Sequence, residues 1–482
     1  MNRPCLVWVR RDLRLEDQPA LNAAITRGGP IIPIYVTDAS DQSDWSPGAA
    51  SRWWLHHSLS RLNHQLISLG SKLIVRHGES LSQLLSLINE TQADAVFWNR
   101  SYEPASIDRD SRVKAELRKQ GITAESSNGR LLFEPWEIQT KEGRPYRMFT
   151  PFWNTCLLRN SSEQPLPAPG RLSSPDHWPQ SLTIDQLGLL PTISWDSGLK
   201  SSWKPETNSA TAELRRFLES TVFDYHIARD VPARPGTSRL SPYLHFGEIS
   251  PRTIWHETLN VVKDRLGSHN SIGADTFLKE IGWREFAYHL LFHFPATCKQ
   301  PLRPEFARFP WREDADGLTA WQRGQTGYPI VDAGMRELWN TGWMHNRVRM
   351  IVASFLVKDL LIPWQRGAEW FWDTLVDADL ASNTLGWQWT AGCGADAAPY
   401  FRVFNPTRQS EKFDPSGEYL RRWLPELQRL PTEYLHAPWT APESVLTKAD
   451  VRLGQTYPHP IVNHEDARRR ALEALSTIKT SP

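Results

Sequence analysis

The residues best suited to chemistry gather in the stretch 377–406, DADLASNTLGWQWTAGCGADAAPYFRVFNP. Two acids, Asp377 and Asp379, precede Asn383, a Trp-Gln-Trp triplet and a glycine-rich turn. A helix would space its apolar residues by three and four, and a strand would alternate them. This mixture of polar, aromatic and small residues follows neither rule. It is typical of a cofactor pocket, and we expect the stretch to line one.

Two further segments carry groups that could bind a ligand. The sequence GTSRLSP at 236–242 offers hydroxyl and backbone N–H groups suited to phosphate, although an ordinary capping turn would have the same composition. Downstream, Glu280 and Arg284 lie four residues apart, with Trp283 between them. That spacing predicts either a surface ion pair or three side chains that project into one cleft.

Arginines accumulate in the segment 326–361. Asn346 and Met350 share one helix face by their spacing, and Arg347 and Arg349 add positive charge beside them. One interpretation is a plain amphipathic helix. The other is an aromatic-lined cleft edged by arginines, which suits a base taken out of DNA with its phosphates held at the rim.

Composition limits the classes of protein. The net charge of +1 neither demands nor excludes nucleic acid, so any basic surface must be local. The four cysteines have no metal-ligand spacing and suit a reducing cytosol. We expect no secretion signal and no membrane span, because no apolar run approaches ~18 residues. The 23 tryptophans fit core packing, stacking or electron transfer.

At least two domains must position these groups, because 482 residues exceed one ordinary core. Residues 1–128 alternate short apolar runs with helical patterns, which predicts an α/β domain with a doubly wound, parallel, five-stranded sheet. The runs are 5–9, 31–36, 72–75, 95–98 and 122–124. No GxGxxG follows the first run, so we expect no dinucleotide at that turn in the manner of a dehydrogenase.

The remainder of the chain changes character twice. Residues 129–202 are rich in proline and indicate a connector that runs over the surface. From 203 to 482 helical periodicity prevails and predicts a larger all-α domain. Its expected helices are 208–226, 250–266, 272–294, 316–323, 330–341, 344–359, 366–375 and 411–424.

The motifs together, in this order, resemble those of the DNA photolyase/cryptochrome family. They are TSRLSP, WREF, TGYPIVDAGMR, GWMHNRVRMIVASFLVKDLL, the stretch 377–406 and FNPTRQSEKFDPSGEYLRRWLPEL, and the match covers nearly the whole chain. RWWLHHSL and GGPIIPIYV resemble the class III cyclobutane pyrimidine dimer photolyases in particular. The resemblance implies light-driven repair, in which reduced FAD passes an electron to a pyrimidine dimer flipped out of DNA.

The resemblance also implies which residues hold FAD in the all-α domain. The flavin-phosphate segment corresponds to Tyr225, Thr237, Ser238, Arg239, Leu240 and Ser241, and the flavin and adenine surroundings to Arg349, Asp377, Ala378, Asp379 and Asn383. An aspartate beside an arginine stays ionised and can accept from ribose or flavin N–H groups. Asn383 offers both a donor and an acceptor near flavin N5.

Further positions resemble those that contact DNA or carry electrons. The pocket for the flipped dimer corresponds to Glu280, Trp283, Asn346 and Met350, and other DNA contacts to Arg229, Arg284, Arg347 and Gln409. Trp311, Trp364 and Trp387 match a tryptophan chain that re-reduces the flavin by electron hopping. A protonated Glu280 would hydrogen-bond the thymine carbonyl edge and stabilise the radical anion of the dimer.

Two other activities occur among relatives of this kind. Enzymes for (6-4) photoproducts have paired histidines where this chain has His345 and Asn346, so Asn346 speaks against that substrate. The alternative is a cryptochrome, a blue-light receptor without repair. Plant cryptochromes usually have Asp, and animal ones Cys, where Asn383 stands here. Thr384 and Leu385 depart from the Asn-Gly that more often follows, which puts the local geometry in question.

A second, light-harvesting chromophore is also implied. Ala105 and Ser106 replace the Asn-Glu of the best-known folate-binding branch, which argues against that particular pocket. The class III resemblance favours 5,10-methenyltetrahydrofolate between the two domains, against the helix of Trp53 and Trp54, with a deazaflavin as the alternative. We expect a monomer that acts on dimer-containing DNA in the bacterial cytosol.

Overall fold

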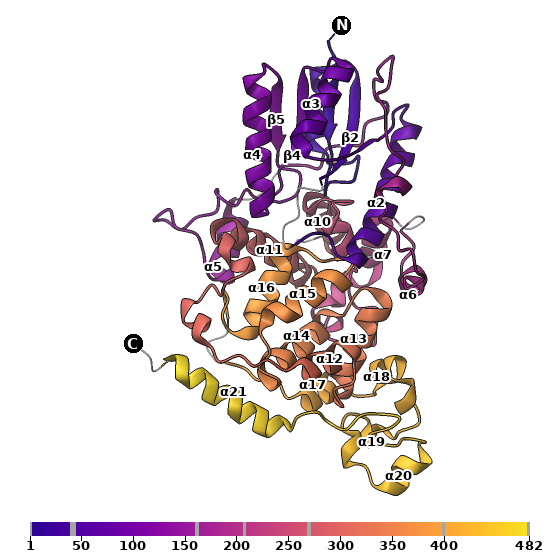
Figure 1. Cartoon of the computed structure of the whole chain (residues 1–482), viewed down its shortest axis with the longest axis vertical. Helices are drawn as coiled ribbons and strands as arrows, with labels where there is room; N and C mark the ends of the chain where they lie inside the picture. The colour runs from indigo at the N-terminus through magenta and orange to yellow at the C-terminus, as the bar shows by residue number, and fades with distance from the viewer. Residues whose placement is uncertain are drawn as a thin grey trace.

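The computed structural model of the chain describes residues 2–38, 45–159, 163–205, 209–267, 271–397 and 401–479. Residues 398–400 of the stretch 377–406, residues 160–162 of the expected connector and Asn208 of one expected helix lie outside the described residues. Figure 1 shows a sheet-containing N-terminal part above a larger helical body.

The N-terminal part is built on a five-stranded parallel sheet, which confirms the predicted α/β class. Its strands are β1 (Cys5–Trp8), β2 (Ile31–Thr37), β3 (Ile74–His77), β4 (Ala95–Asn99) and β5 (Thr123–Ser127), in the order β3-β2-β1-β4-β5. Cys5 pairs with both Ile31 and Ala95, so β1 lies between β2 and β4. The strand order reverses there, and the carboxyl ends of β1 and β4 therefore flank a crevice.

Four helices connect these strands: α1 (Pro19–Arg27), α2 (Ala49–Ser68), α3 (Ser80–Thr91) and α4 (Pro104–Lys119). The longest, α2, reaches the helical body (Figure 1). Trp54 Nε1 donates to Glu248 Oε1 at 2.7 Å, and the Ala49 amide donates to Asp373 Oδ1 at 2.9 Å. The two parts of the chain are thus joined through polar contacts as well as apolar packing.

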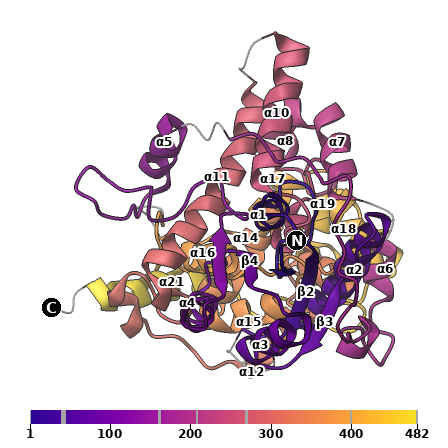
Figure 2. The ribbon, with the colours of Figure 1, turned by 90° about the horizontal axis from the view of Figure 1, so that it is seen from above.

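Two helices lie within the expected connector, α5 (Phe149–Arg159) and α6 (Ser197–Ser202). Figure 2 shows α5 beside α11 (Ile272–His293). The Phe149 ring stacks on Trp283 of α11 with ring centroids 3.8 Å apart. The aromatic leading part of the connector therefore packs against the helical body rather than running free over it.

The described residues after Ser127 contain no further strand, and the predicted all-α class is confirmed. In addition to α11 the helices are α7 (Ala210–Ser220), α8 (Tyr225–Ala228), α9 (Ser241–His245), α10 (Pro251–Leu266), α12 (Ala315–Arg323), α13 (Pro329–Thr341), α14 (Asn346–Ser354), α15 (Trp364–Thr374), α16 (Leu380–Ala391), α17 (Pro406–Phe413), α18 (Glu418–Trp423), α19 (Thr432–Leu435), α20 (Glu443–Lys448) and α21 (His464–Lys479).

Several helix predictions were wrong at their ends. The expected helix 411–424 is two helices, because Pro415 cannot continue a helix and Gly417 has φ +73°. The expected helix 344–359 changes after α14 into a π-helix, η5 (Phe355–Asp359). The expected helix 208–226 is interrupted between Ser220 and Tyr225.

The helix α16 was missed altogether, although it runs through the stretch 377–406. Thr384, Trp387 and Gln388 are all buried, so polar and aromatic side chains alike point into the protein. A helix that is enclosed on most sides has no apolar stripe to reveal it.

Candidate active site

A cavity of about 1210 Å³ opens in the helical part of the chain. More than half of the predicted site residues line it: Arg229, Ser241, Glu280, Trp283, Arg284, Asn346, Arg349, Met350, Asp377, Ala378, Asp379, Asn383 and Trp387. The cavity therefore joins the two groups of residues that the sequence assigned to a cofactor and to a base taken out of DNA.

Asp377 is held by two donors in the wall of this cavity. Its Oδ2 accepts from Ser241 Oγ at 2.6 Å and from Arg349 Nη2 at 2.8 Å. Arg349 Nε also donates to the Met344 carbonyl at 2.7 Å, which fixes the guanidinium. Asp377 Oδ1 is buried and has no hydrogen-bond partner among the described residues. An unsatisfied buried acceptor is costly, so this oxygen is available to a ligand donor.

Asp379 carries a second negative charge in the cavity wall. It is the N-cap of α16, with Oδ1 accepting from the Ser382 amide at 2.9 Å. The Tyr288 hydroxyl donates to Oδ2, and His245 Nδ1 lies 3.7 Å from the same oxygen. Burial opposes the charge, but His245 and Tyr288 hold the pKa of Asp379 well below its usual range.

Asn383 and Trp387 follow Asp379 on one face of α16. Asn383 Nδ2 donates to the Ala368 carbonyl of α15 at 3.1 Å. The Trp387 ring presses against the same helix, because a Cβ at Gly367 would lie 2.0 Å from Trp387 Cη2. The close approach of α15 and α16 thus sets both side chains in the cavity wall.

The three predicted electron-transfer tryptophans belong to one hydrophobic core, but only Trp387 lines the cavity. The rings of Trp321 and Phe371 lie against Trp387, with centroid separations of 6.2 and 5.0 Å. Trp364 is fully buried at the start of α15, and Trp311 is partly buried. The contact of Trp321 with Trp387 was not predicted. The chain has 23 tryptophans, and the residues around Trp321 do not set it apart from the others.

Helix α11 contributes an acid and an aromatic ring to the cavity. Glu280 Oε1 accepts from Arg229 Nη1 at 2.5 Å. Burial raises the pKa of Glu280 above its usual value, although Arg229 opposes the shift. Trp283 is held flat against Phe149. Trp283 and Phe149 thus form an apolar face next to an acid whose pKa is raised.

Helix α14 contributes Asn346 and Met350 to the cavity lining. His345 caps this helix from a buried position, where Nδ1 accepts from the Arg347 amide at 3.2 Å. Burial lowers the pKa of His345 to about 4, so its ring is neutral at physiological pH. The Arg347 side chain pairs with Asp230 at 2.5 Å.

The remaining predicted residues lie outside the lining of the cavity: Tyr225, Thr237, Ser238, Arg239, Leu240, Trp311, Trp364, Arg347 and Gln409. Arg239 has φ +52°, and its guanidinium lies 4.0 Å from the Trp203 ring centroid. Tyr225 packs edge-on to Phe277 at 5.5 Å. Within the segment 236–242, Ser241 is the residue that reaches the cavity lining.

Three residues that shape the site were not predicted. Tyr288 lies eight residues after Glu280 on α11. Helix residues separated by multiples of about four share a face, so the sequence could have placed Tyr288 on the same face as Glu280. His245 lies four residues after Ser241 and offered the same signal on a shorter helix. Arg402 lines the cavity from a segment without regular secondary structure, and nothing in its sequence surroundings distinguishes it.

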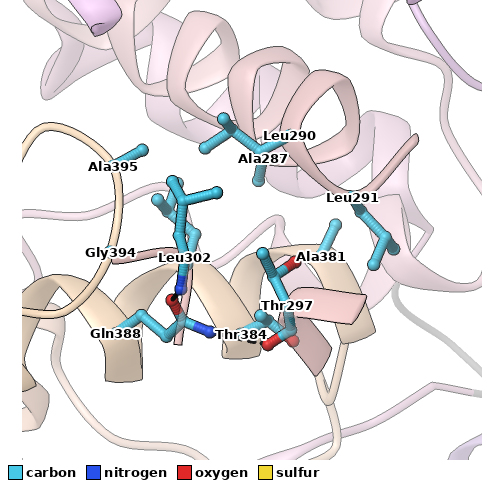
Figure 3. A pocket seen from close by; sticks show the side chains of 11 residues that line it. Ala287, Leu290, Leu291, Thr297, Leu302, Ala381, Thr384, Gln388, Gly394 and Ala395 are labelled. Carbon is cyan, nitrogen blue, oxygen red and sulfur yellow. Dashed lines mark hydrogen bonds between the residues drawn. The ribbon is translucent and has the colours of Figure 1, made fainter. Parts of the chain in front are cut away.

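A much smaller space of about 20 Å³ lies between α11 and α16 beside the main cavity (Figure 3). Gln388 spans it, with Oε1 accepting from the Leu302 amide at 2.9 Å and Nε2 donating to the Thr297 carbonyl at 2.6 Å. Thr384 faces this small space, and Leu385 borders both spaces. The departure from Asn-Gly therefore falls mainly beside the site and not within it.

A separate cavity of about 730 Å³ lies between the two parts of the chain, at the carboxyl ends of β1 and β4. Its lining includes Trp8, Arg10, Tyr35, Trp45, Ser51, Arg52, Leu55, Glu103, Ala105, Ser106, His245, Phe246, Trp372 and Leu380. Helix α2 borders it as expected. Trp53 and Trp54 do not line it, because their indole N–H groups donate to Asp196 and Glu248.

The chain is similar to known proteins over nearly its whole length. Residues 5–170 match the family model described as DNA photolyase, and residues 277–477 match the FAD binding domain of DNA photolyase. A deoxyribodipyrimidine photo-lyase of Agrobacterium fabrum is 50% identical over 477 residues, which cover 99% of this chain and 98% of the relative. Cryptochrome-1 of Arabidopsis thaliana is 43% identical over 485 residues, which cover 98% of this chain and 70% of the relative.

The fold of the chain is also similar to that of a solved structure. The crystal structure of a bacterial class III photolyase from Agrobacterium tumefaciens superposes with a TM-score of 0.95 at 48% identity, covering 100% of this chain and 98% of the other. Among the described helices, none combines the length and the apolar character needed to cross a membrane.

Proposed function

This chain belongs to the DNA photolyase family and is a DNA-repair enzyme of that family, and we propose that it splits cyclobutane pyrimidine dimers in DNA when illuminated. One observation carries the proposal. A single cavity of about 1210 Å³ joins the acids Asp377 and Asp379 to Glu280 and Trp283. The first pair suits a cofactor, and the second suits two stacked pyrimidines taken out of the duplex.

The residues present fit FAD. The cavity exceeds the roughly 300–1,000 Å³ of ordinary ligand sites, as a dinucleotide with a flipped dimer beside it would require. Asp377 Oδ1, which has no partner among the described residues, can accept from a ribose hydroxyl or a flavin N–H group. When bound, FAD supplies light absorption and electron transfer, which side chains cannot provide.

The chain itself binds and orients the cofactor. Arg349 and Asp379 place fixed charges of opposite sign in the cavity wall, and Asn383 offers an amide beside them. Ser241 lines the cavity, which supports the assignment of its neighbours to the phosphate end of FAD. These neighbours in the sequence are Thr237, Ser238, Arg239 and Leu240, and we assign Tyr225 to the same end of the cofactor.

We assign the dimer to the pocket of Glu280, Trp283, Asn346 and Met350. Trp283 offers a flat face because Phe149 holds it from behind. The raised pKa of Glu280 favours its protonated form, which can donate to a thymine carbonyl where negative charge develops during bond cleavage.

Positive groups around this pocket would hold the DNA backbone. We assign phosphate and backbone contacts to Arg229, Arg284, Arg347 and Gln409, with Arg402 as an addition. With a net charge of only +1, the affinity must come from this local set, and it should fall as salt rises.

We assign electron donation to the flavin to Trp387, followed by Trp364 and Trp311. Support comes from Trp387, which lines the cavity and packs within one core with the other two. Aromatic rings that pack in or against one core suit electron transfer between the surface and the flavin.

Two residues favour dimer repair over the related activities. Asn346 lines the cavity where an enzyme for (6-4) photoproducts would place a histidine, and the adjacent His345 is buried and neutral. Asn383 lines the cavity where cryptochromes usually carry Asp or Cys. The relative of higher identity is also a photo-lyase, at 50% against 43% for the plant cryptochrome.

The proposal is tested by illuminating the reduced holoprotein with an oligonucleotide that carries one thymine dimer. We expect the dimer to disappear in blue or near-ultraviolet light and to persist in the dark. A matched oligonucleotide with a (6-4) photoproduct serves as control and should remain unchanged. Full flavin content without repair of either lesion would favour the light-receptor alternative.

We propose that the cavity of about 730 Å³ holds the light-harvesting chromophore. Its aromatic lining, which includes Trp45, Trp372 and Phe246, suits the flat ring of 5,10-methenyltetrahydrofolate, with a deazaflavin as the alternative. Acid releases either chromophore, and their absorption spectra distinguish them. Enlarging the side chain of Ala105 to Trp should lower the chromophore content and leave the FAD content unchanged.

We further propose that the chain works as a monomer in the bacterial cytosol, with the DNA. None of its four cysteines forms a disulfide in the described part of the chain, which suits a reducing compartment. The only partner that this function requires is DNA with a pyrimidine dimer.

A further inference from the structure

The π-helix η5 (Phe355–Asp359) buries a lysine that no step of the proposed reaction uses. Lys358 is 4% exposed. Its Nζ donates a hydrogen bond to the Arg402 carbonyl and lies 4.3 Å from the ring centroid of Phe401. π-helical turns are rare and often occur at functional sites. A buried ammonium group in such a turn therefore suggests a functional role for Lys358.

Both contacts of Lys358 fall on the residues 401–404, here called the rim segment. The Phe404 amide donates to Ser354 Oγ at 3.3 Å, so α14 and η5 together hold this segment. Arg402 is exposed and lines the cavity of about 1210 Å³. Lys358 thus holds, from inside the protein, the backbone of a residue whose side chain borders the site.

The charge on Lys358 is poorly balanced. The titratable and charged groups that face it are Asp359, Cys393 and Arg402, and through Asp359 also His464 and Arg470. Burial and, to a lesser degree, the nearby Arg402 lower the pKa of Lys358 to about 7, although Asp359 opposes the shift. Asp359 Oδ1 is already paired with His464 Nδ1 at 2.6 Å. Burial raises the pKa of Cys393 to about 12, so its thiol stays neutral.

We propose that Lys358 is a positioning residue for DNA binding, which holds the rim segment so that the Arg402 guanidinium meets a DNA phosphate. The two cations repel each other across a short stretch of backbone. A phosphate at Arg402 relieves this repulsion and favours the protonated form of Lys358. DNA binding and protonation of Lys358 therefore support each other, and the protein takes up a proton when it binds DNA.

The proposal rests on the DNA site of the proposed function, but it concerns affinity and not the repair chemistry. Since phosphate raises the pKa of Lys358, its contribution to affinity is complete below the pKa of the free protein. It is lost as the pH rises through the pKa of the complex.

The test measures the Kd of the holoprotein for a dimer-containing oligonucleotide from pH 6 to 8.5 at fixed salt, by fluorescence anisotropy. We expect the Kd of the natural chain to rise about threefold to tenfold over this range. Lys358→Met should bind more weakly at pH 6 and approach the natural chain at pH 8.5. Titration of Glu280 is common to both proteins and cancels in the ratio of their Kd values.

A second variant guards against a folding defect in Lys358→Met. Arg402→Gln changes an exposed side chain and should also reduce the pH dependence, and the double variant should lose no more affinity than Arg402→Gln alone. Calorimetry at pH 7 in two buffers of different ionisation enthalpy should detect more proton uptake by the natural chain than by Arg402→Gln. Lys448→Met, which removes an exposed lysine of α20, is the control and should behave like the natural chain.

The proposal is overturned if the ratio of the Kd values for Lys358→Met and the natural chain does not change with pH, or if Arg402→Gln keeps the full proton uptake. Light-dependent repair at saturating DNA is measured on the same samples. Repair by the natural chain and by Lys358→Met under those conditions leaves the proposed function intact, whatever the Kd values show.

Discussion

Replacement of Asp377 by alanine should yield a folded chain that retains little flavin. The change leaves Arg349 and Ser241 without their shared acceptor in a site where the aspartate side chain is only 2% exposed. The affinity for FAD loses the hydrogen bond that Asp377 Oδ1 would accept from the cofactor, and a hydrogen bond to a charged group contributes roughly 1.5–3 kcal/mol. At 1.4 kcal/mol per factor of ten, we expect the affinity for FAD to fall by about tenfold to 100-fold. Flavin fluorescence titration of the apoprotein measures the change.

The control for this prediction is Asp316→Asn, which changes an exposed aspartate of α12. It should keep the natural flavin content. Asp377→Asn should lie between the two, because an amide preserves the shape and one acceptor but not the charge. If Asp377→Ala binds FAD with natural affinity, Asp377 does not hold the cofactor. Thermal unfolding of the apoproteins separates a lost ligand from a lost fold.

Replacement of Glu280 by glutamine should slow repair about tenfold and leave DNA binding nearly unchanged. Glutamine keeps the size of the side chain, so the pocket with Trp283 should still accept the dimer. Its amide is a weaker donor than a carboxylic acid to a carbonyl that gains negative charge. The loss of about 1.4 kcal/mol is within the range for one hydrogen bond. The measurement is the quantum yield of repair at saturating oligonucleotide.

The pH profile of the same variant separates a chemical from a structural role. Burial raises the pKa of Glu280, and the protonated form is the useful one. Repair by the natural chain should therefore decline as the pH rises through that raised pKa, and the glutamine variant should be flat. Glu443→Gln, at an exposed position of α20, is the control. An unchanged quantum yield in Glu280→Gln would exclude the proposed role.

The sequence was a good guide where the local pattern alone decides the structure. The five apolar runs became five parallel strands, and the three central ones, β2, β1 and β4, are buried along almost their whole length, as a continuous apolar sequence predicts. It was a poor guide for α16, whose Thr384 and Gln388 are polar and yet buried. It also missed the break at Pro415 and Gly417, where a four-residue turn interrupts a pattern that remains helical on both sides.

What the sequence determined by itself was the class of each part of the chain and, through the combined motifs, the residues worth examining. Only the tertiary structure decided which of them meet. Ser241 and Asp377 are 136 residues apart and share a hydrogen bond, and Tyr288 reaches Asp379 across 91 residues. The periodicity of apolar residues shows that one face of a helix is buried, but it does not show which other segment packs against that face. The partners of Asp377, Glu280 and Lys358 therefore followed from helix packing, which brings distant segments to one cavity.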